Sequence, residues 1–259
     1  MWDLISNSVY AGILLSIAIG IIGSLIVINK ASAITGSIAH GSFGGIGLAI
    51  FLGSSVLLTT TVFAIFLTLI LAFISIKYPH RLDSFLGVIW ALGMSLGILF
   101  LSLAPGYHSD VLSYLFGNIL LVDSNDLKYM IGVDFILLIS IIFLYNYFLA
   151  MSYDREFLYL RGINANIIYT LFLILTTLSI VMSVRAIGII LVLALFTIPP
   201  LIAERFTDKF YNMLILSAVL AAVFTTAGIF ISAKYDIAPT PAIVIIASIG
   251  LFLSLFKKN

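Results

Sequence analysis

The stretch SIAHGSFGGIGLAIFLG, residues 37–53, combines an apolar helix pattern with small residues and one histidine. Small residues recur every four positions in two neighbouring rows, and on a helix this spacing brings each row onto one face. Such a face lets another membrane helix approach closely. We therefore expect the glycines of both rows to line a close helix contact. The first row is Ser37, Gly41, Gly45 and Ala49, and the second is Gly36, His40 and Gly44.

His40 is the histidine of this stretch, and it lies deeper in an apolar segment than any other histidine of the chain. An ionisable side chain inside a bilayer is costly and often marks a transport path. A neutral imidazole is also a good ligand for zinc and other divalent first-row metals. His40 is therefore a candidate metal donor, although a site needs further donors that the sequence does not identify. The alternative, a packing helix whose histidine bonds a neighbouring carbonyl, stays open.

The composition of the whole chain indicates a membrane protein. Of its 259 residues, 63% are hydrophobic and 9% are charged, whereas a soluble domain carries about 25% charged residues. The net charge of +1 gives no case for nucleic-acid binding. The absence of cysteine excludes disulfides and thiolate metal sites. The first ten residues, MWDLISNSVY, lack the basic region of a cleaved signal peptide.

Apolar runs long enough to cross a bilayer predict an all-α polytopic fold with about nine spans, eight to ten being possible. The polar gaps between them are short, so we expect one transmembrane permease domain over residues 1–259 and no separate soluble domain. A shorter apolar run, Val111–Val122, fits a re-entrant or interfacial helix. The predicted spans are Val9–Ile28, Ser37–Leu52, Val56–Ile76, Ser84–Leu103, Tyr129–Ala150, Ile167–Val184, Ile187–Ala203, Tyr211–Ala233 and Pro239–Phe256.

The distribution of lysine and arginine predicts the orientation. With nine spans, one side carries nine basic residues and the other carries three. The positive-inside rule then places the C-terminus in the cytoplasm and the N-terminus outside. The larger set is Lys30, Lys77, Arg81, Arg155, Arg161, Arg205, Lys209, Lys257 and Lys258, and the smaller set is Lys128, Arg185 and Lys234.

Sequence motifs of membrane enzymes and nucleotide-binding sites are missing. The chain has no phosphate-binding loop of the form G-x-x-x-x-G-K-[ST], and its glycine-rich segment lacks the lysine. It has neither H-E-x-x-H nor G-x-S-x-G. We therefore expect a transport subunit that binds no cofactor and takes its energy from a partner or from an ion.

The polar stretch SYDREFLYLRG, residues 152–162, interleaves charged and apolar residues between two spans. We expect a short helix capped by Ser152 and ended by Gly162. Its apolar side chains suit docking into a groove on a soluble partner. The alternative is an interfacial helix lying on the membrane. The residues expected to make the partner contact are Asp154, Glu156, Phe157, Leu160 and Gly162.

Other polar or helix-breaking residues lie near span ends. Pro199 and Pro200 are expected to break the seventh span, either as a hinge or in a purely structural role. Asp134, Arg185 and Glu204 lie towards span ends, where a charged side chain usually reaches the headgroups. Asp236, in the stretch YDIAPTP, is interpreted as a polar turn residue.

Six stretches in this order resemble the membrane permease subunit of bacterial zinc/manganese ABC importers. The resemblance covers nearly the whole chain, and DVLSYLFGNILLVDSNDL is its most specific part, with Tyr114, Leu115, Phe116, Gly117, Leu120 and Asp126 in family positions. The other stretches are AHGSFGGIGLAIFLG, DSFLGVIWALGMSLGILFLSL (with Asp83, Gly87, Ser95 and Gly97), SYDREFLYLRGIN, VRAIGIILVLALFTIPPLIAERF (with Gly188, Leu191, Pro199 and Ala203) and YDIAPTPAIV.

The chain departs from the family pattern at two places. The family usually has an aspartate four residues before the histidine, where this chain has Gly36. Some zinc-type members have a histidine where this chain has Ala91. A complete set of metal ligands is therefore not carried over by the resemblance.

The resemblance implies an importer for divalent metal ions, zinc first and manganese second, that works by alternating access. It implies a homodimer in the bacterial cytoplasmic membrane, a pair of cytoplasmic ATP-binding subunits and an external metal-binding protein. It also implies that residues 152–162 are the coupling helix that contacts the ATP-binding subunits. Two alternatives remain: an ion-coupled secondary transporter, for which Asp134 is the nearest intramembrane carboxylate, and a non-transporting membrane scaffold.

Overall fold

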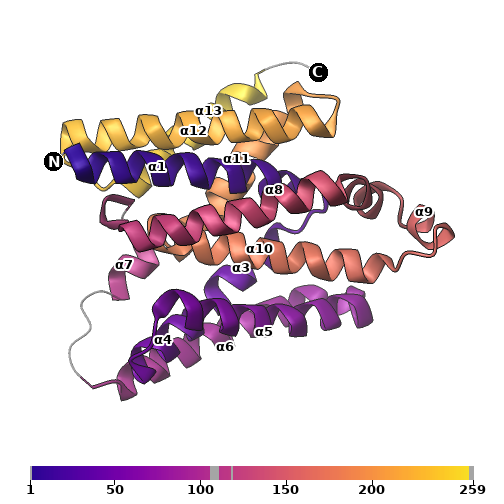
Figure 1. Cartoon of the computed structure of the whole chain (residues 1–259), viewed down its shortest axis with the longest axis horizontal. Coiled ribbons are helices and arrows are strands. Elements are labelled where there is room, and N and C mark those ends of the chain that lie inside the picture. The colour runs from indigo at the N-terminus through magenta and orange to yellow at the C-terminus, as the bar shows by residue number, and fades with distance from the viewer. Residues whose placement is uncertain (1, 106–110, 118, 257–259) are drawn as a thin grey trace. The chain divides into compact units, whose positions relative to one another are not determined.

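A computed structural model describes residues 2–105, 111–117 and 119–256, and over these residues the chain is helical with no β-strand (Figure 1). The predicted all-α polytopic membrane fold is thus confirmed. Residues 106–110 lie outside the described residues, as do Lys257 and Lys258 of the charge count.

Seven apolar stretches of helix within the described ranges are long enough to cross a membrane, so the predicted number of nine is approximate. Two further predicted spans coincide with α11 (Ile189–Phe206) and the shorter α13 (Pro239–Leu255). The seven are α1–η1–α2 (Trp2–Ala18, Ile19–Gly23, Ser24–Ile28), α3–α4 (Ser32–Gly41, Phe43–Leu52), α5 (Val56–Lys77), η2–α6 (Pro79–Arg81, Leu82–Leu103), α8 (Ser124–Tyr153), α10 (Ala165–Ile187) and α12 (Phe210–Tyr235).

Short helices occupy the two stretches that were expected to be too short or too polar to span. The predicted run Val111–Val122 forms two pieces, α7 (Val111–Phe116) and the 3₁₀ turn η3 (Ile119–Leu121). The chain turns after α7 because Gly117 has a φ of +71°, in the left-handed region that favours glycine. The polar stretch between α8 and α10 forms α9 (Arg155–Leu160).

The contacts divide the chain into two compact units. The first unit comprises residues 1–28, 111–138 and 182–259, and the second comprises residues 29–110 and 139–181. Helices α8 and α10 each contribute residues to both units. The prediction of one permease domain over the whole chain stays a prediction.

In the first unit, α1 lies beside α12, and α12 lies beside α13 (Figure 1). The first span contains a π-helical turn, η1, whose residues are all buried. Two glycines of this turn allow close approach of its neighbours: a Cβ at Gly20 would lie 2.9 Å from the Leu214 carbonyl oxygen, and one at Gly23 would lie 2.8 Å from the Phe196 carbonyl oxygen. The π-turn thus fits the first span against α11 and α12.

In the second unit, α3 and α4 pack along α6, and α4 also packs on α5. The second predicted span is interrupted at Ser42, whose hydroxyl donates to the Ala39 carbonyl over 2.6 Å. The backbones of α4 and α6 approach so closely that a Cβ at Gly47 would lie 2.8 Å from the Gly97 Cα. The contact between these two helices therefore depends on glycine.

Candidate metal path and coupling helix

The ring of His40 stacks on the indole of Trp90, the residue of α6 that precedes Ala91. The ring centroids are 3.9 Å apart, and the planes are inclined by 13°. The Nδ1 atom of His40 is buried and has no hydrogen-bond partner among the described residues. The alternative in which the histidine bonds a neighbouring carbonyl is therefore wrong as far as the Nδ1 atom is concerned.

The described residues around His40 do not supply a complete metal site. Among the described residues, no group of three or more histidine, cysteine, aspartate or glutamate side chains could hold a metal ion. Gly36, where the family has an aspartate, is buried in α3. The chain thus presents one candidate imidazole donor and an aromatic neighbour, without a complete ligand set in the described part of the molecule.

The glycines that surround His40 in sequence lie against α5 and α6. A Cβ at Gly41 would lie 3.1 Å from the Leu67 side chain, and one at Gly45 would lie 2.8 Å from the Thr60 Cα. Gly44 is equally tight, since its Cβ would lie 2.8 Å from the Phe63 ring. These glycines hold α3–α4 close to both neighbours and so fix the backbone that carries His40.

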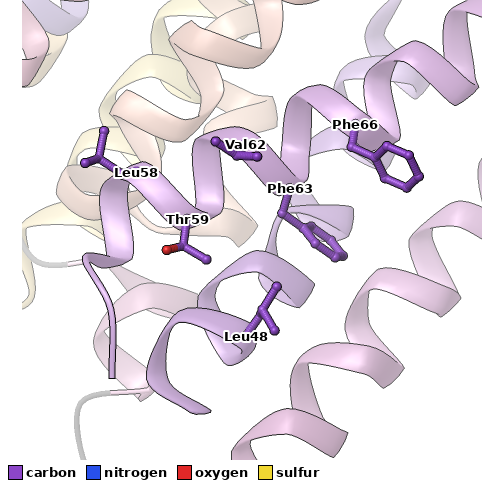
Figure 2. A pocket seen from close by; sticks show the side chains of 6 residues that line it. All are labelled: Leu48, Leu58, Thr59, Val62, Phe63 and Phe66. Atoms are coloured by element: carbon purple, nitrogen blue, oxygen red, sulfur yellow. The ribbon is translucent and has the colours of Figure 1, made fainter. Parts of the chain in front are cut away.

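A groove beside α4 and α5, of about 490 Å³, offers no metal ligand set (Figure 2). Its single polar side chain is Thr59, whose hydroxyl already pairs with that of Ser54 at 2.8 Å. His40 does not line it. We therefore do not place the metal path in this groove, whose lining is Leu48, Leu58, Thr59, Val62, Phe63 and Phe66.

Asp154, rather than Ser152, caps α9. The Asp154 carboxylate accepts a hydrogen bond from the Phe157 amide over 3.1 Å, as expected of an N-cap residue. The predicted cap by Ser152 is wrong, because its hydroxyl donates to the Phe148 carbonyl at 2.8 Å and accepts from Asn29 at 2.9 Å. Ser152 is thus occupied inside the second unit and cannot serve the helix that follows.

The outer face of α9 is apolar and exposed. Leu160 is 88% exposed, whereas Leu158 on the same helix is 1% exposed. Phe157 and Glu156 are also exposed, and the Arg161 guanidinium lies over the Phe157 ring at 4.6 Å. Gly162 follows with a φ of +72°, and its amide donates to the Tyr159 carbonyl over 2.9 Å. The helix is thus anchored by Leu158 and presents Leu160 outward.

Pro199 and Pro200 lie inside α11, which continues to Phe206, so the predicted break of the helix is wrong. Both are buried. A proline has no amide hydrogen, so the carbonyls of Leu195 and Phe196 lose their usual helical partners. The Phe196 carbonyl faces Gly23 of the π-turn.

Arg185 and Asp134 do not reach outward as expected of charges near span ends. The Arg185 Nε atom lies 3.2 Å from the Asp126 carboxylate. Asp134 is 3% exposed, and neither of its carboxylate oxygens has a hydrogen-bond partner among the described residues. The Arg185–Asp126 pair was not predicted from the sequence, because the two residues lie on different helices that are far apart in the chain.

Comparison with known proteins reveals similarity over nearly the full length. The model of the ABC 3 transport family matches residues 1–258. A probable metal transport system membrane protein of Chlamydia pneumoniae is 35% identical, over 94% of this chain and 85% of that protein. The zinc uptake protein ZnuB of Buchnera aphidicola is 30% identical over 100% and 99% of the two chains. The manganese transport protein MntC of Halalkalibacterium halodurans is 28% identical over 98% and 87%.

A solved structure also has the same fold. The chain superimposes on PsaBC of Streptococcus pneumoniae, solved in complex with a Fab, with a TM-score of 0.88 and 26% identity. The match covers 98% of this chain and 91% of the other. The likeness therefore extends over the helices of both units.

Proposed function

This chain belongs to the ABC 3 transport family and is the permease subunit of a metal importer of that family, and we propose that it carries zinc or, second, manganese. The zinc and manganese relatives support these two metals. An imidazole such as His40 binds either metal, and the affinity order alone does not separate them. The metal is the cargo of the transporter, and the chain holds no resident cofactor in this proposal.

The working assembly in this proposal is a homodimer in the bacterial cytoplasmic membrane, with its N-termini outside and its C-termini in the cytoplasm. A pair of ATP-binding subunits contacts its cytoplasmic face, and an external metal-binding protein delivers the ion. The basic residues on the side of α9 support this orientation. The lack of a complete ligand set among the described residues around His40 supports a path that receives ligands from more than one chain or from water.

The coupling role is assigned to α9, and one observation carries it: Leu160 is 88% exposed on a helix that buries Leu158. An exposed leucine beside the Phe157 and Arg161 pair offers an apolar anchor with a charged rim. Such a helix suits a groove on a soluble protein. Movement of the ATP-binding subunits would then displace α9 together with α8 and α10, which flank it in the chain.

In the transport cycle, His40 binds the metal transiently and does not form a cage. A transported ion must bind well enough to enter and weakly enough to leave. The Trp90 stack holds the imidazole in one orientation, while its buried Nδ1 lacks a protein partner among the described residues. Alternating access then exposes this donor first to one side of the membrane and next to the other.

The assignment is tested by ATP hydrolysis in proteoliposomes that contain the permease, its ATP-binding subunit and its metal-binding protein. We expect no hydrolysis by the permease alone and metal-stimulated hydrolysis by the assembly. Leu160→Ala should lower the stimulated rate by about fivefold or more, since an interface anchor contributes about 1–2 kcal/mol. Leu158→Ala is the matched control, because it removes the same side chain from the buried face of α9. It should lower the melting temperature of the permease. Full stimulation with Leu160→Ala would exclude the coupling role of α9.

A further inference from the structure

Three side chains from three segments of the first unit meet at Arg185, near the end of α10. Its Nε atom pairs with the Asp126 carboxylate of α8 at 3.2 Å. Its Nη1 atom donates to the Tyr114 hydroxyl of α7 at 2.7 Å, and the guanidinium lies 5.4 Å from the centre of that ring. The Asp126 side chain is 6% exposed, so its negative charge depends on Arg185 and on the Asp123 amide, which donates to it over 3.2 Å. We call Tyr114, Asp126 and Arg185 the Arg185 cluster.

Two glycines allow the backbone at the end of α7 to contact the backbone between α10 and α11, next to Arg185. Gly117 follows α7, and Gly188 is the single residue between α10 and α11. Both have left-handed φ values, +71° and +77°. A Cβ at Gly188 would lie 2.6 Å from the Leu115 carbonyl oxygen, and a Cβ at Gly117 would overlap the Ile187 and Gly188 backbone. The end of α7 is therefore in backbone contact with the joint between α10 and α11.

The Arg185 cluster lies where α8 begins, beside the short helix α7. Asp126 lies in the first turn of α8, and α9 follows the last residue of that 30-residue helix. Because α8 is long enough to cross a membrane, its first turn, which carries Asp126, lies at one end of a membrane span. The six-residue α7 is too short to cross. Broken helical segments at membrane depth occur where they are buried in protein or line a path.

We propose that Arg185 is a positioning residue: with Asp126 and Tyr114 it latches α7 to the α10–α11 joint, and this latch must open for the joint to pivot during transport. The proposal rests on the proposed function. A turn of α11 relative to α10 about Gly188 would separate Gly188 from Gly117 unless α7 moved as well. The Arg185 cluster makes α7, the start of α8 and the end of α10 move together while it is closed.

The latch predicts a change in coupling rather than only in stability. Without it, α7 can leave the joint at any stage, so ATP hydrolysis is no longer tied to the passage of one metal load. We expect Arg185→Gln to raise the number of ATP molecules hydrolysed per metal ion carried by about fivefold or more. Asp126→Asn should act in the same direction. The double variant should hydrolyse no more ATP per metal ion than either single variant, because the two residues act as a pair.

The experiment uses the complete importer in proteoliposomes, with metal uptake and phosphate release measured on the same sample. Lys128→Gln is the matched control, because it removes an exposed positive charge two residues from Asp126. It should keep the wild-type ratio. A wild-type ratio in Arg185→Gln, or effects of Arg185→Gln and Asp126→Asn that simply add, would overturn the latch. If Arg185→Gln does not fold, Tyr114→Phe replaces it. We expect a smaller rise in the number of ATP molecules hydrolysed per metal ion, and a wild-type ratio in this variant would overturn the proposal.

A second measurement separates the latch from the proposed function. Hydrogen exchange of the α7 amides, residues 111–116, is measured on the full-length permease in detergent. We expect Arg185→Gln to exchange there about tenfold faster or more than the wild type, while α13 keeps its rate. Unchanged α7 exchange overturns the latch, whatever the transport assay gives. If the wild-type importer carries no metal but α7 exchange responds, the proposed function fails and the latch stands.

Discussion

His40 and Trp90 form a parallel stack, with ring centroids 3.9 Å apart and planes inclined by 13°. The stack occupies one face of the imidazole and leaves its nitrogens at the ring edge. It therefore fixes the direction in which His40 can offer a lone pair to a passing ion. Trp90, which lies on α6, has this role because glycines bring α3–α4 close to α6.

Replacing Trp90 tests whether this stack matters for metal passage. Trp90→Leu removes the aromatic partner, whereas Trp90→Phe keeps an aromatic ring. An aromatic pair contributes about 0.5–1.5 kcal/mol, so we expect the KM for metal uptake to rise about two- to tenfold in Trp90→Leu and less in Trp90→Phe. Initial uptake rates over a range of metal concentrations check this. Equal KM values in all three proteins would show that the orientation of His40 is irrelevant.

The glycine contact between α4 and α6 predicts a difference between two alanine variants. Gly47→Ala places a methyl group 2.8 Å from the Gly97 Cα, so the helices must separate. We expect a loss of about 1–3 kcal/mol, as in other overpacked sites, seen as a lower melting temperature in detergent. Gly87→Ala on α6 meets no atom within 4 Å and should stabilise the helix by about 1 kcal/mol. Equal melting temperatures for the two variants would contradict the close contact.

The Asp154 cap makes a prediction about α9. Asp154→Ala removes the side-chain acceptor for the Phe157 amide, which costs about 1 kcal/mol at an N-cap. We expect faster hydrogen exchange in α9 and weaker binding of the ATP-binding subunit. Ser152→Ala is the comparison, because Ser152 bonds Phe148 and Asn29 instead of the helix. If Ser152→Ala loosened α9 as much as Asp154→Ala, the assignment of the cap would be incorrect.

The buried carboxylate of Asp134 tests the alternative of an ion-coupled transporter. Asp134→Asn is nearly isosteric and removes the cost of burying a charge. Because we assign energy coupling to ATP, we expect metal uptake to stay within about twofold of the wild type, and the melting temperature to be equal or higher. Uptake driven by an imposed proton or sodium gradient, and lost in Asp134→Asn, would instead favour the secondary transporter.

The sequence predicted the features that depend on neighbouring residues in the chain. Apolar runs of sufficient length gave the spans, and a short run bounded by polar residues gave the non-spanning Val111–Val122 segment. The stretch that became α9 was found because charged and apolar residues alternate between two spans. These signals are local, so no knowledge of the fold was needed to find them.

Features that depend on partners distant in the chain were missed. The Arg185–Asp126 pair joins two helices, and nothing near Arg185 distinguishes it from a charge that reaches the headgroups. Trp90 was not singled out as the partner of His40, because the stack exists only once α3 and α6 are packed. Ser152 and Asp154 are both good N-cap residues, and only the competing bonds of Ser152 decide between them.

Uptake of radioactive zinc or manganese into proteoliposomes that hold this permease tests whether it is part of an ATP-driven metal importer. We expect uptake only when the ATP-binding subunit, the metal-binding protein and ATP are all present, and a marked loss of uptake in His40→Ala. Uptake by the permease alone, driven by an ion gradient without ATP, would contradict this expectation.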